Sequence, residues 1–199
     1  MTFDIVIPDG NEKEFEKNAK KLGIDTLIFL YDKAPKDSKR KVGIITDKKI
    51  KTKHLVFSRG NERDRWIFEK QKPNVVFDLE FESKKDKTHF RNSGLDQVLG
   101  KLAFKNDIMI GFNFSKLLKS SKKGIILGRI MQNIKICEKY KTKYFMASFA
   151  KDPSEMRSPF DLKCLLLCLK ARKVDLELFS WFRDFPSGVI LVKTKIFIS

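Results

Sequence analysis

Short apolar runs alternate with longer amphipathic segments along this chain, and this alternation limits its possible folds more than any other feature. Each apolar run has the usual length of a buried strand. The predicted strands are 3–7, 26–30, 54–57, 75–79, 108–111, 144–147 and 189–192. The predicted helices comprise one with Phe15, Ala19 and Leu22 on a single face, then 62–70, 94–105, a long one carrying Ile126 to Cys137, one that begins near Pro159, and 175–183. This order is typical of successive βα units around a parallel sheet.

Periodicity leaves two architectures open, a closed barrel and an open doubly wound sheet. The sequence contains neither a Gly-x-Gly-x-x-Gly pattern nor a phosphate-loop Gly-Lys-Ser/Thr, so no nucleotide-binding motif supports the open sheet. A length of 199 residues with 42% apolar side chains fits one domain over 1–199. The exception to the regular order is 32–53, which we expect to be a basic loop.

The N-terminal sequence lacks a basic region followed by a long apolar run, so we expect no secretory signal. The longest apolar cluster, 162–171, is interrupted by Lys163 and Lys170 and falls short of the roughly twenty residues that a membrane helix needs. Three cysteines are an odd number and do not suggest a disulfide framework. These features predict a cytoplasmic protein that does not bind membranes.

Lysine and arginine outnumber the acids by 42 to 25, which gives a formal net charge of +17. Such a charge favours a polyanionic partner, and nucleic acid is the usual one. Two stretches concentrate the cations: 33–53 has nine bases and two acids, and 116–143 has nine bases and one acid. Both stretches are candidates for the surface that meets this partner, and we expect Arg129 on the outer surface of its helix. For any single lysine, solvation of the surface is the more common role.

One stretch, 89–103, joins a basic turn of small residues to an amphipathic helix. Ser93 and Asp96 have the spacing of a capping box, and the apolar residues that follow recur at helical intervals. Arg91 would therefore lie just outside a helix N-terminus, where free backbone N–H groups and an arginine favour a bound phosphate. A capped helix with a structural or solvated arginine explains the same pattern.

The stretch His89-Phe-Arg-Asn-Ser-Gly-Leu-Asp-Gln-Val-Leu-Gly-Lys-Leu102 resembles the signature of the ribonuclease P protein component 3 family of archaea and eukaryotes. A second block supports the resemblance: 146–150 is similar to the family's small-residue strand end, and Met156-Arg-Ser-Pro-Phe-Asp-Leu162 to its Arg-Ser-Pro turn and following helix. The resemblance is strongest over 75–172. Asp96 and Gly100 depart from the family's usual residues, and 33–53 cannot be aligned.

The resemblance implies a compact α/β fold, a TIM-like (β/α) barrel of the polymerase-and-histidinol-phosphatase type. It implies a non-catalytic subunit of ribonuclease P that binds and stabilises the catalytic RNA for removal of the 5′ leader from precursor tRNA. Its implied partners are ribonuclease P RNA, ribonuclease P protein component 2, the other protein subunits of ribonuclease P, and precursor tRNA as the substrate of the holoenzyme. No cofactor is expected on the protein itself, and magnesium is expected at the RNA. The compact length resembles archaeal members.

The residues expected at these interfaces come from both blocks and from the basic stretch. Those expected to bind RNA are His89, Arg91, Ser93, Arg157, Lys122, Lys123 and Arg129. Phe90 and Phe160 are the candidates for a protein interface, because aromatic residues are enriched at binding hot spots. Trp181, Phe182 and Phe185 form a third aromatic group, and for all these aromatics a place in the core is the more common role.

Two other classes of function remain open from the residues alone. A metal-dependent phosphoesterase with the same type of barrel would need several histidines and carboxylates at one site, whereas this chain has two histidines, His54 and His89. Asp78 and Glu80 could bind a stray divalent ion but fit surface or half-buried carboxylates better. Ser93 and Ser148 lack an evident base, so no catalytic residue is expected. An unrelated basic RNA-binding scaffold is the remaining alternative.

Overall fold

The computed structural model describes residues 2–33, 35, 40–83 and 85–172. Seven parallel strands form one sheet in which the spatial order follows the sequence order. The strands are β1 (Phe3–Val6), β2 (Thr26–Tyr31), β3 (Lys41–Ile45), β4 (Leu55–Arg59), β5 (Val75–Phe77), β6 (Met109–Asn113) and β7 (Tyr144–Ala147). The chain beyond β7 returns to β1, where Val6 bridges Ala150 and the N–H of Ile7 donates to the carbonyl of Ala150 at 2.8 Å. The sheet therefore nearly closes, and the predicted barrel is confirmed.

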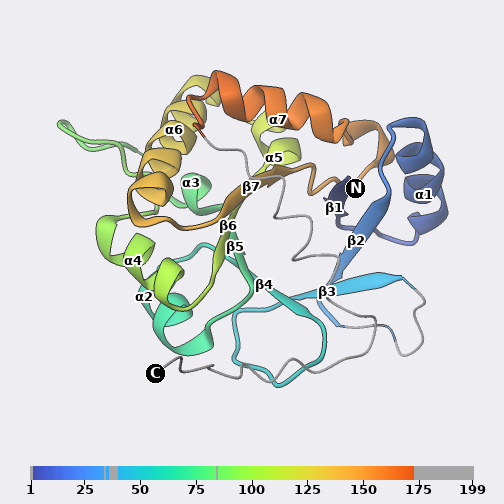
Figure 1. Ribbon diagram of the computed structural model, residues 1–199, viewed down its shortest axis with the longest axis horizontal. Helices are drawn as coiled ribbons and strands as arrows, with labels where there is room; N and C mark the ends of the chain where they lie inside the picture. Colours follow the sequence, from blue (N-terminus) through green and yellow to red (C-terminus); the bar gives the residue numbers. More distant parts are fainter. Residues whose placement is uncertain (1, 34, 36–39, 84, 173–199) are drawn as a thin grey trace, which may run out of the picture.

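Helices surround this sheet on its outer side (Figure 1). They are α1 (Glu12–Lys21), α2 (Asp64–Trp66) continued by the π-helical η1 (Ile67–Gln71), α3 (Leu79–Glu82), α4 (Gln97–Lys105), α5 (Phe114–Lys119), α6 (Lys123–Tyr140), the 3₁₀ helix η2 (Pro153–Glu155) and α7 (Pro159–Cys168). Residues 46–54, between β3 and β4, contain no helix. None of the helices in the described part of the chain is long and apolar enough to cross a membrane.

Alternate strand residues point into the barrel and fill it with large apolar side chains. Phe57, Phe77 and Phe149 are buried there, and the rings of Phe77 and Phe149 stack with centroids 4.8 Å apart. Gly43 of β3 is small because a Cβ at this position would lie 2.6 Å from Leu30 and 2.7 Å from Phe57. The interior of the barrel is thus a core of large apolar side chains.

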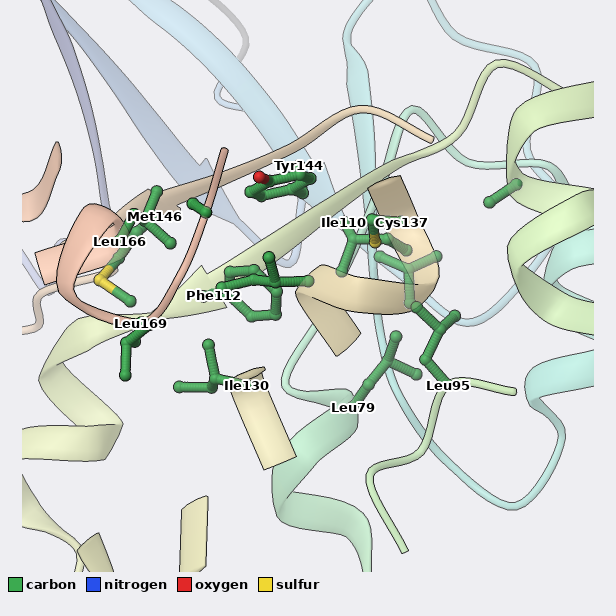
Figure 2. Close-up of a cluster of buried hydrophobic side chains, with 14 of the residues drawn as sticks. Leu79, Leu95, Ile110, Phe112, Ile130, Cys137, Tyr144, Met146, Leu166 and Leu169 are labelled. Atoms are coloured by element: carbon green, nitrogen blue, oxygen red, sulfur yellow. The ribbon is translucent and has the colours of Figure 1, made fainter. Parts of the chain in front are cut away.

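A second core lies between the sheet and the helices that cover β5, β6 and β7. Figure 2 shows side chains from β6, β7, α6 and α7 meeting around Phe112, whose ring centroid is 6.2 Å from that of Tyr144. Ile130 and Ile134 of α6 and Leu166 of α7 belong to this core. The arrangement fixes α6 and α7 against the barrel, so residues on their outer faces have defined positions.

The structure corrects one predicted segment and leaves others outside its description. The basic loop expected at 32–53 is wrong for Lys41–Ile45, which form β3 between β2 and β4 with Val42, Gly43 and Ile44 buried. The strand predicted at 189–192, the helix predicted at 175–183, and Trp181, Phe182 and Phe185 lie outside the described residues.

Candidate functional site

The first half of the signature stretch lies in a loop, residues 86–96, that leads from α3 into α4 and lies beside α6 (Figure 1). We call it the signature loop. Two amides of α6 hold its backbone: Gln132 Nε2 donates to the carbonyl of Arg91 at 3.1 Å, and Asn133 Nδ2 to the carbonyl of Ser93 at 2.9 Å. Gly94 has a φ of +77°, and a Cβ there would collide with the carbonyl of Leu79. The loop is therefore held to α6 at Arg91 and at Ser93. Its conformation requires glycine at position 94.

Arg91 is exposed on this anchored loop. Its guanidinium lies against Gly128 of α6, where a Cβ would come within 2.7 Å of the arginine Nε. Because Gly128 has no side chain, the guanidinium of Arg91 can lie directly against the backbone of the helix. The backbone of Arg91 is held by Gln132, and its exposed guanidinium lies beside α6 where a partner can reach it.

Ser93 has a different role from the predicted one. It is buried, and its Oγ donates to the carbonyl of Leu95 at 3.3 Å. The cap of α4 is Asp96, whose carboxylate accepts from the N–H of Leu99 at 2.7 Å. The predicted capping by Ser93 is therefore wrong, and a carboxylate occupies the helix N-terminus at which we expected a phosphate. Arg91 itself must supply the attraction for an anion.

The structure also contradicts the expectation that Arg129 lies on the outer surface of α6. Its side chain is 2% exposed, its Nε donates to Asp86 Oδ1 at 2.7 Å, and its Nη1 donates to the carbonyls of Glu80 and Ser83 at 2.9 and 2.7 Å. The expected outward orientation is wrong, because the signature loop covers this face of α6. Although burial raises the pKa of Asp86, hydrogen bonds from Arg129 and from the N–H of Asn92 hold it below its usual value. Arg129 fixes the loop and is inaccessible to RNA.

The remaining predicted residues lie at three places. His89 and Phe90 are exposed on the signature loop next to Arg91 in the sequence, and Lys122 and Lys123 are exposed at the start of α6. Arg157 instead precedes α7. Its Nη1 donates to the carbonyls of Ser154 and Met156 at 3.0 and 2.7 Å, and its guanidinium lies 5.7 Å from the centroid of the Phe114 ring. Phe160, in the first turn of α7, is 72% exposed.

Polar residues at the carboxyl ends of β5 and β6 form a cluster that the sequence suggested only as an acid pair. Asp78 Oδ1 accepts from Asn113 Nδ2, and Asp78 Oδ2 accepts from Lys116 Nζ, both at 3.0 Å. Glu80 is buried, and its burial together with the charge of Asp78 raises its pKa to about 8. The ammonium of Lys116 therefore forms an ion pair with Asp78 at this edge of the sheet. No group of three or more histidines, cysteines or acids suited to a metal occurs within the described ranges.

A cavity of about 740 Å³ opens between the signature loop, α3, the start of α2 and α6. We call it the loop pocket. Its lining includes the aromatic Phe90, the carboxylates Glu62 and Glu82, the amide Asn92 and the cation Lys135. Sequence reasoning missed this pocket because Glu62, Glu82 and Lys135 are far apart along the chain, and no spacing rule connects them.

Comparisons with known proteins agree with the signature. No protein-family model matches the chain. Ribonuclease P protein component 3 of Methanococcus vannielii is 26% identical over 159 residues, which is 77% of this chain and 66% of that protein. Proteins of the same name from Methanococcus maripaludis and Methanosarcina acetivorans are 35% and 34% identical over 77 residues, 38% of this chain. The chain thus aligns with less than two thirds of the length of these relatives.

A solved structure described as archaeal ribonuclease P with mature tRNA contains a chain of the same fold. It superposes with a TM-score of 0.71 at 21% identity and covers 97% of this chain and 99% of the other. The seven-stranded barrel with its outer helices is therefore a known architecture. Together with the curated relatives, these findings confirm that the chain is similar to ribonuclease P protein component 3, as its two sequence blocks predict.

Proposed function

We propose that this chain is a non-catalytic protein subunit of ribonuclease P that binds and stabilises the catalytic RNA for removal of the 5′ leader from precursor tRNA. The observation that carries the proposal is the anchored signature loop, which presents Arg91 on α6 within a protein of net charge +17. The similarity to component 3 proteins supports the same conclusion. Catalysis is assigned to the RNA and its magnesium, and the protein needs no bond-breaking group.

Two cations lie along one face of α6 and are suited to an RNA backbone. Arg91 lies over Gly128, and Lys135 follows seven residues later, which returns to the same face of the helix. At 1.5 Å per residue these two positions are roughly 10 Å apart along the helix axis, so each cation can contact a different phosphate. Lys122 and Lys123, exposed at the start of the helix, lie on another side of it and add to the positive charge of this region. Contacts of this kind read the shape and charge of folded RNA without reading its sequence. Preferential binding to the folded RNA would then stabilise it by mass action.

The same proposal includes protein partners, namely component 2 and the other protein subunits of the enzyme. The outer face of α7 is a second region available to them. Phe160 and Leu167 are seven residues apart, so they share one side of the helix, and they are 72% and 47% exposed. Apolar side chains left in water at helical spacing are suited to a protein interface.

The test is cleavage of precursor tRNA by the cognate ribonuclease P RNA and component 2 in limiting magnesium, with and without this chain. Stimulation that requires both the RNA and component 2 is the expected result. A control reaction with this chain and precursor tRNA alone should show no cleavage. If stimulation is absent although all components are folded, the proposed function is wrong. RNA-free hydrolysis that depends on a divalent metal would instead favour a phosphoesterase.

A further inference from the structure

The loop pocket combines an exposed aromatic ring, neutral amides, carboxylates and the cations Arg91 and Lys135 within one cavity. A site for phosphate alone would not include carboxylates, because they repel it. A socket for an apolar protein side chain would be lined mainly by apolar groups. The mixture matches a nucleobase, whose faces are apolar and whose edges carry donors and acceptors.

Phe90 supplies a stacking surface at this pocket. It is 61% exposed, although most phenylalanines of the described chain are buried or half-buried. Its neighbour Arg91 is held in place through its backbone carbonyl by Gln132. An aromatic ring beside a fixed cation is the usual combination for an unstacked base and its backbone.

The acidic side of the pocket determines which base fits. Glu62 precedes α2 and Glu82 ends α3, yet both line the same cavity. Burial raises the pKa of the adjacent Asp64 to about 8, and the charge of Glu82, a hydrogen bond to Glu82 and the charge of Asp96 add to this increase. Asp64 therefore keeps its proton at neutral pH and donates a hydrogen bond with it to Glu82. The exposed carboxylate of Glu62 and the second oxygen of Glu82 remain on this side of the pocket as acceptors for hydrogen-bond donors.

Guanine is the base whose edge presents donors in the arrangement that a carboxylate can accept. A carboxylate is an acceptor with two oxygens, and it can receive two parallel hydrogen bonds. The Watson–Crick edge of guanine presents two neighbouring donors, N1–H and the N2 amino group. Adenine and cytosine each offer one amino group beside an acceptor, and uracil offers one N–H between two carbonyls. These three bases would leave carboxylate oxygens facing acceptors, which repel them and form no hydrogen bond.

We propose that the loop pocket receives one unpaired guanine of the bound RNA, an inference that rests on the proposed function. The base stacks on Phe90, and the carboxylate of Glu62 or Glu82 accepts from its N1–H and N2 amino group. Lys135 lies at the same pocket and faces the sugar–phosphate backbone. The remaining cations near α6 bind phosphates, so this pocket adds base selectivity to a surface that otherwise reads charge and shape.

The experiment measures fluorescence anisotropy of labelled heptamers with the full chain at low salt. The probes are UUUGUUU and the same RNA with adenosine or inosine at the central position. The wild-type chain should bind the guanosine heptamer about tenfold more tightly than the adenosine heptamer. Inosine keeps N1–H but lacks the N2 amino group, so its affinity should fall between the two.

Matched variants connect the preference to the pocket. Glu62→Gln or Glu82→Gln should reduce the guanosine preference to about twofold, because a neutral amide cannot accept both hydrogen bonds. Glu14→Gln, an exposed substitution on α1, should leave the preference unchanged. Phe90→Leu should weaken binding of all three heptamers, whereas Phe104→Leu, at a similarly exposed aromatic on α4, should not. Melting curves of all variants confirm that they remain folded.

Equal binding of the three heptamers by the wild-type chain would overturn the inference. Retention of the guanosine preference by both Glu62→Gln and Glu82→Gln would also overturn it. If the chain stimulates cleavage of precursor tRNA but does not discriminate among the heptamers, the guanine pocket is wrong and the subunit role stands. If the heptamers are discriminated but cleavage is not stimulated, the subunit role is wrong and the pocket remains a base-binding site.

Discussion

Arg91 and Arg129 both lie beside the signature loop, but their surroundings give them opposite roles. Arg91 is exposed and rests on Gly128, whereas Arg129 is buried and donates hydrogen bonds to Asp86 and to two backbone carbonyls. The exposed guanidinium remains available for phosphate. The buried one cannot leave its partners without exposing unpaired polar groups.

Arg91→Ala should weaken RNA binding and leave folding nearly unchanged. Removing one phosphate contact should reduce the slope of log affinity against log salt by about one, while an exposed substitution changes stability by roughly 0.5 kcal/mol or less. Titrations of ribonuclease P RNA at several salt concentrations measure the slope, and Arg65→Ala on α2, also an exposed arginine, is the control. An equal loss of melting temperature and RNA affinity would show that Arg91 is structural.

Arg129→Met should give the reverse pattern, because its main effect is on folding. The methionine fills much of the space but removes the donor to the carbonyls of Glu80 and Ser83 and leaves Asp86 with only the N–H of Asn92. The expected loss is about 3 kcal/mol in the free energy of unfolding. Urea unfolding followed by circular dichroism measures it. A variant as stable as the wild type would contradict the structural role that we assign to Arg129.

At the scale of elements, Gly94 allows the signature loop to pass close to the backbone of Leu79 in α3. Gly94→Ala should destabilise the protein by about 2 kcal/mol or more, because alanine is strained at a φ of +77° and its Cβ would collide with the carbonyl of Leu79. Gly124→Ala is the matched control, since no atom lies within 4 Å of the added Cβ in the first turn of α6. It should stabilise the protein by up to about 0.5 kcal/mol. Thermal unfolding of both variants tests the contrast, and similar melting temperatures would contradict it.

Sequence patterns predict six of the seven strands because buried parallel strands are continuous apolar runs. They miss β3 because Gly43 weakens its strand signal and lysines flank it, although Leu30 and Phe57 require that glycine. They also miss the burial of Arg129, because helical periodicity identifies only an apolar face. The signature loop adds a second, polar buried face to α6, which includes Asn133. Such contacts depend on long-range packing that spacing does not encode.

At the scale of the whole molecule, the closure between β1 and β7 depends on a buried carboxyl group. Asp4 of β1 is fully buried, and its Oδ1 accepts from the N–H of Ser148 at 2.7 Å, just beyond β7. Its Oδ2 is buried without a hydrogen-bond partner. Burial raises the pKa of Asp4 to about 6, above its usual 3.8, despite the opposing hydrogen bonds from Ser148. The barrel therefore closes most favourably when this group is protonated.

Asp4→Asn should increase stability at neutral pH and have little effect at acidic pH. Because the folded-state pKa is raised, the wild-type contribution is fully present below about pH 4 and is lost as the pH rises through about 6. The full loss is on the order of 3 kcal/mol. Asparagine keeps an acceptor for the N–H of Ser148 and carries no charge, so its stability should not change over this range on account of position 4. Urea unfolding of both proteins at pH 4.5 and pH 7.5 measures the difference, with Asp107→Asn, an exposed site, as the control. A gain of the same size at both pH values would show that the charge of Asp4 does not oppose closure.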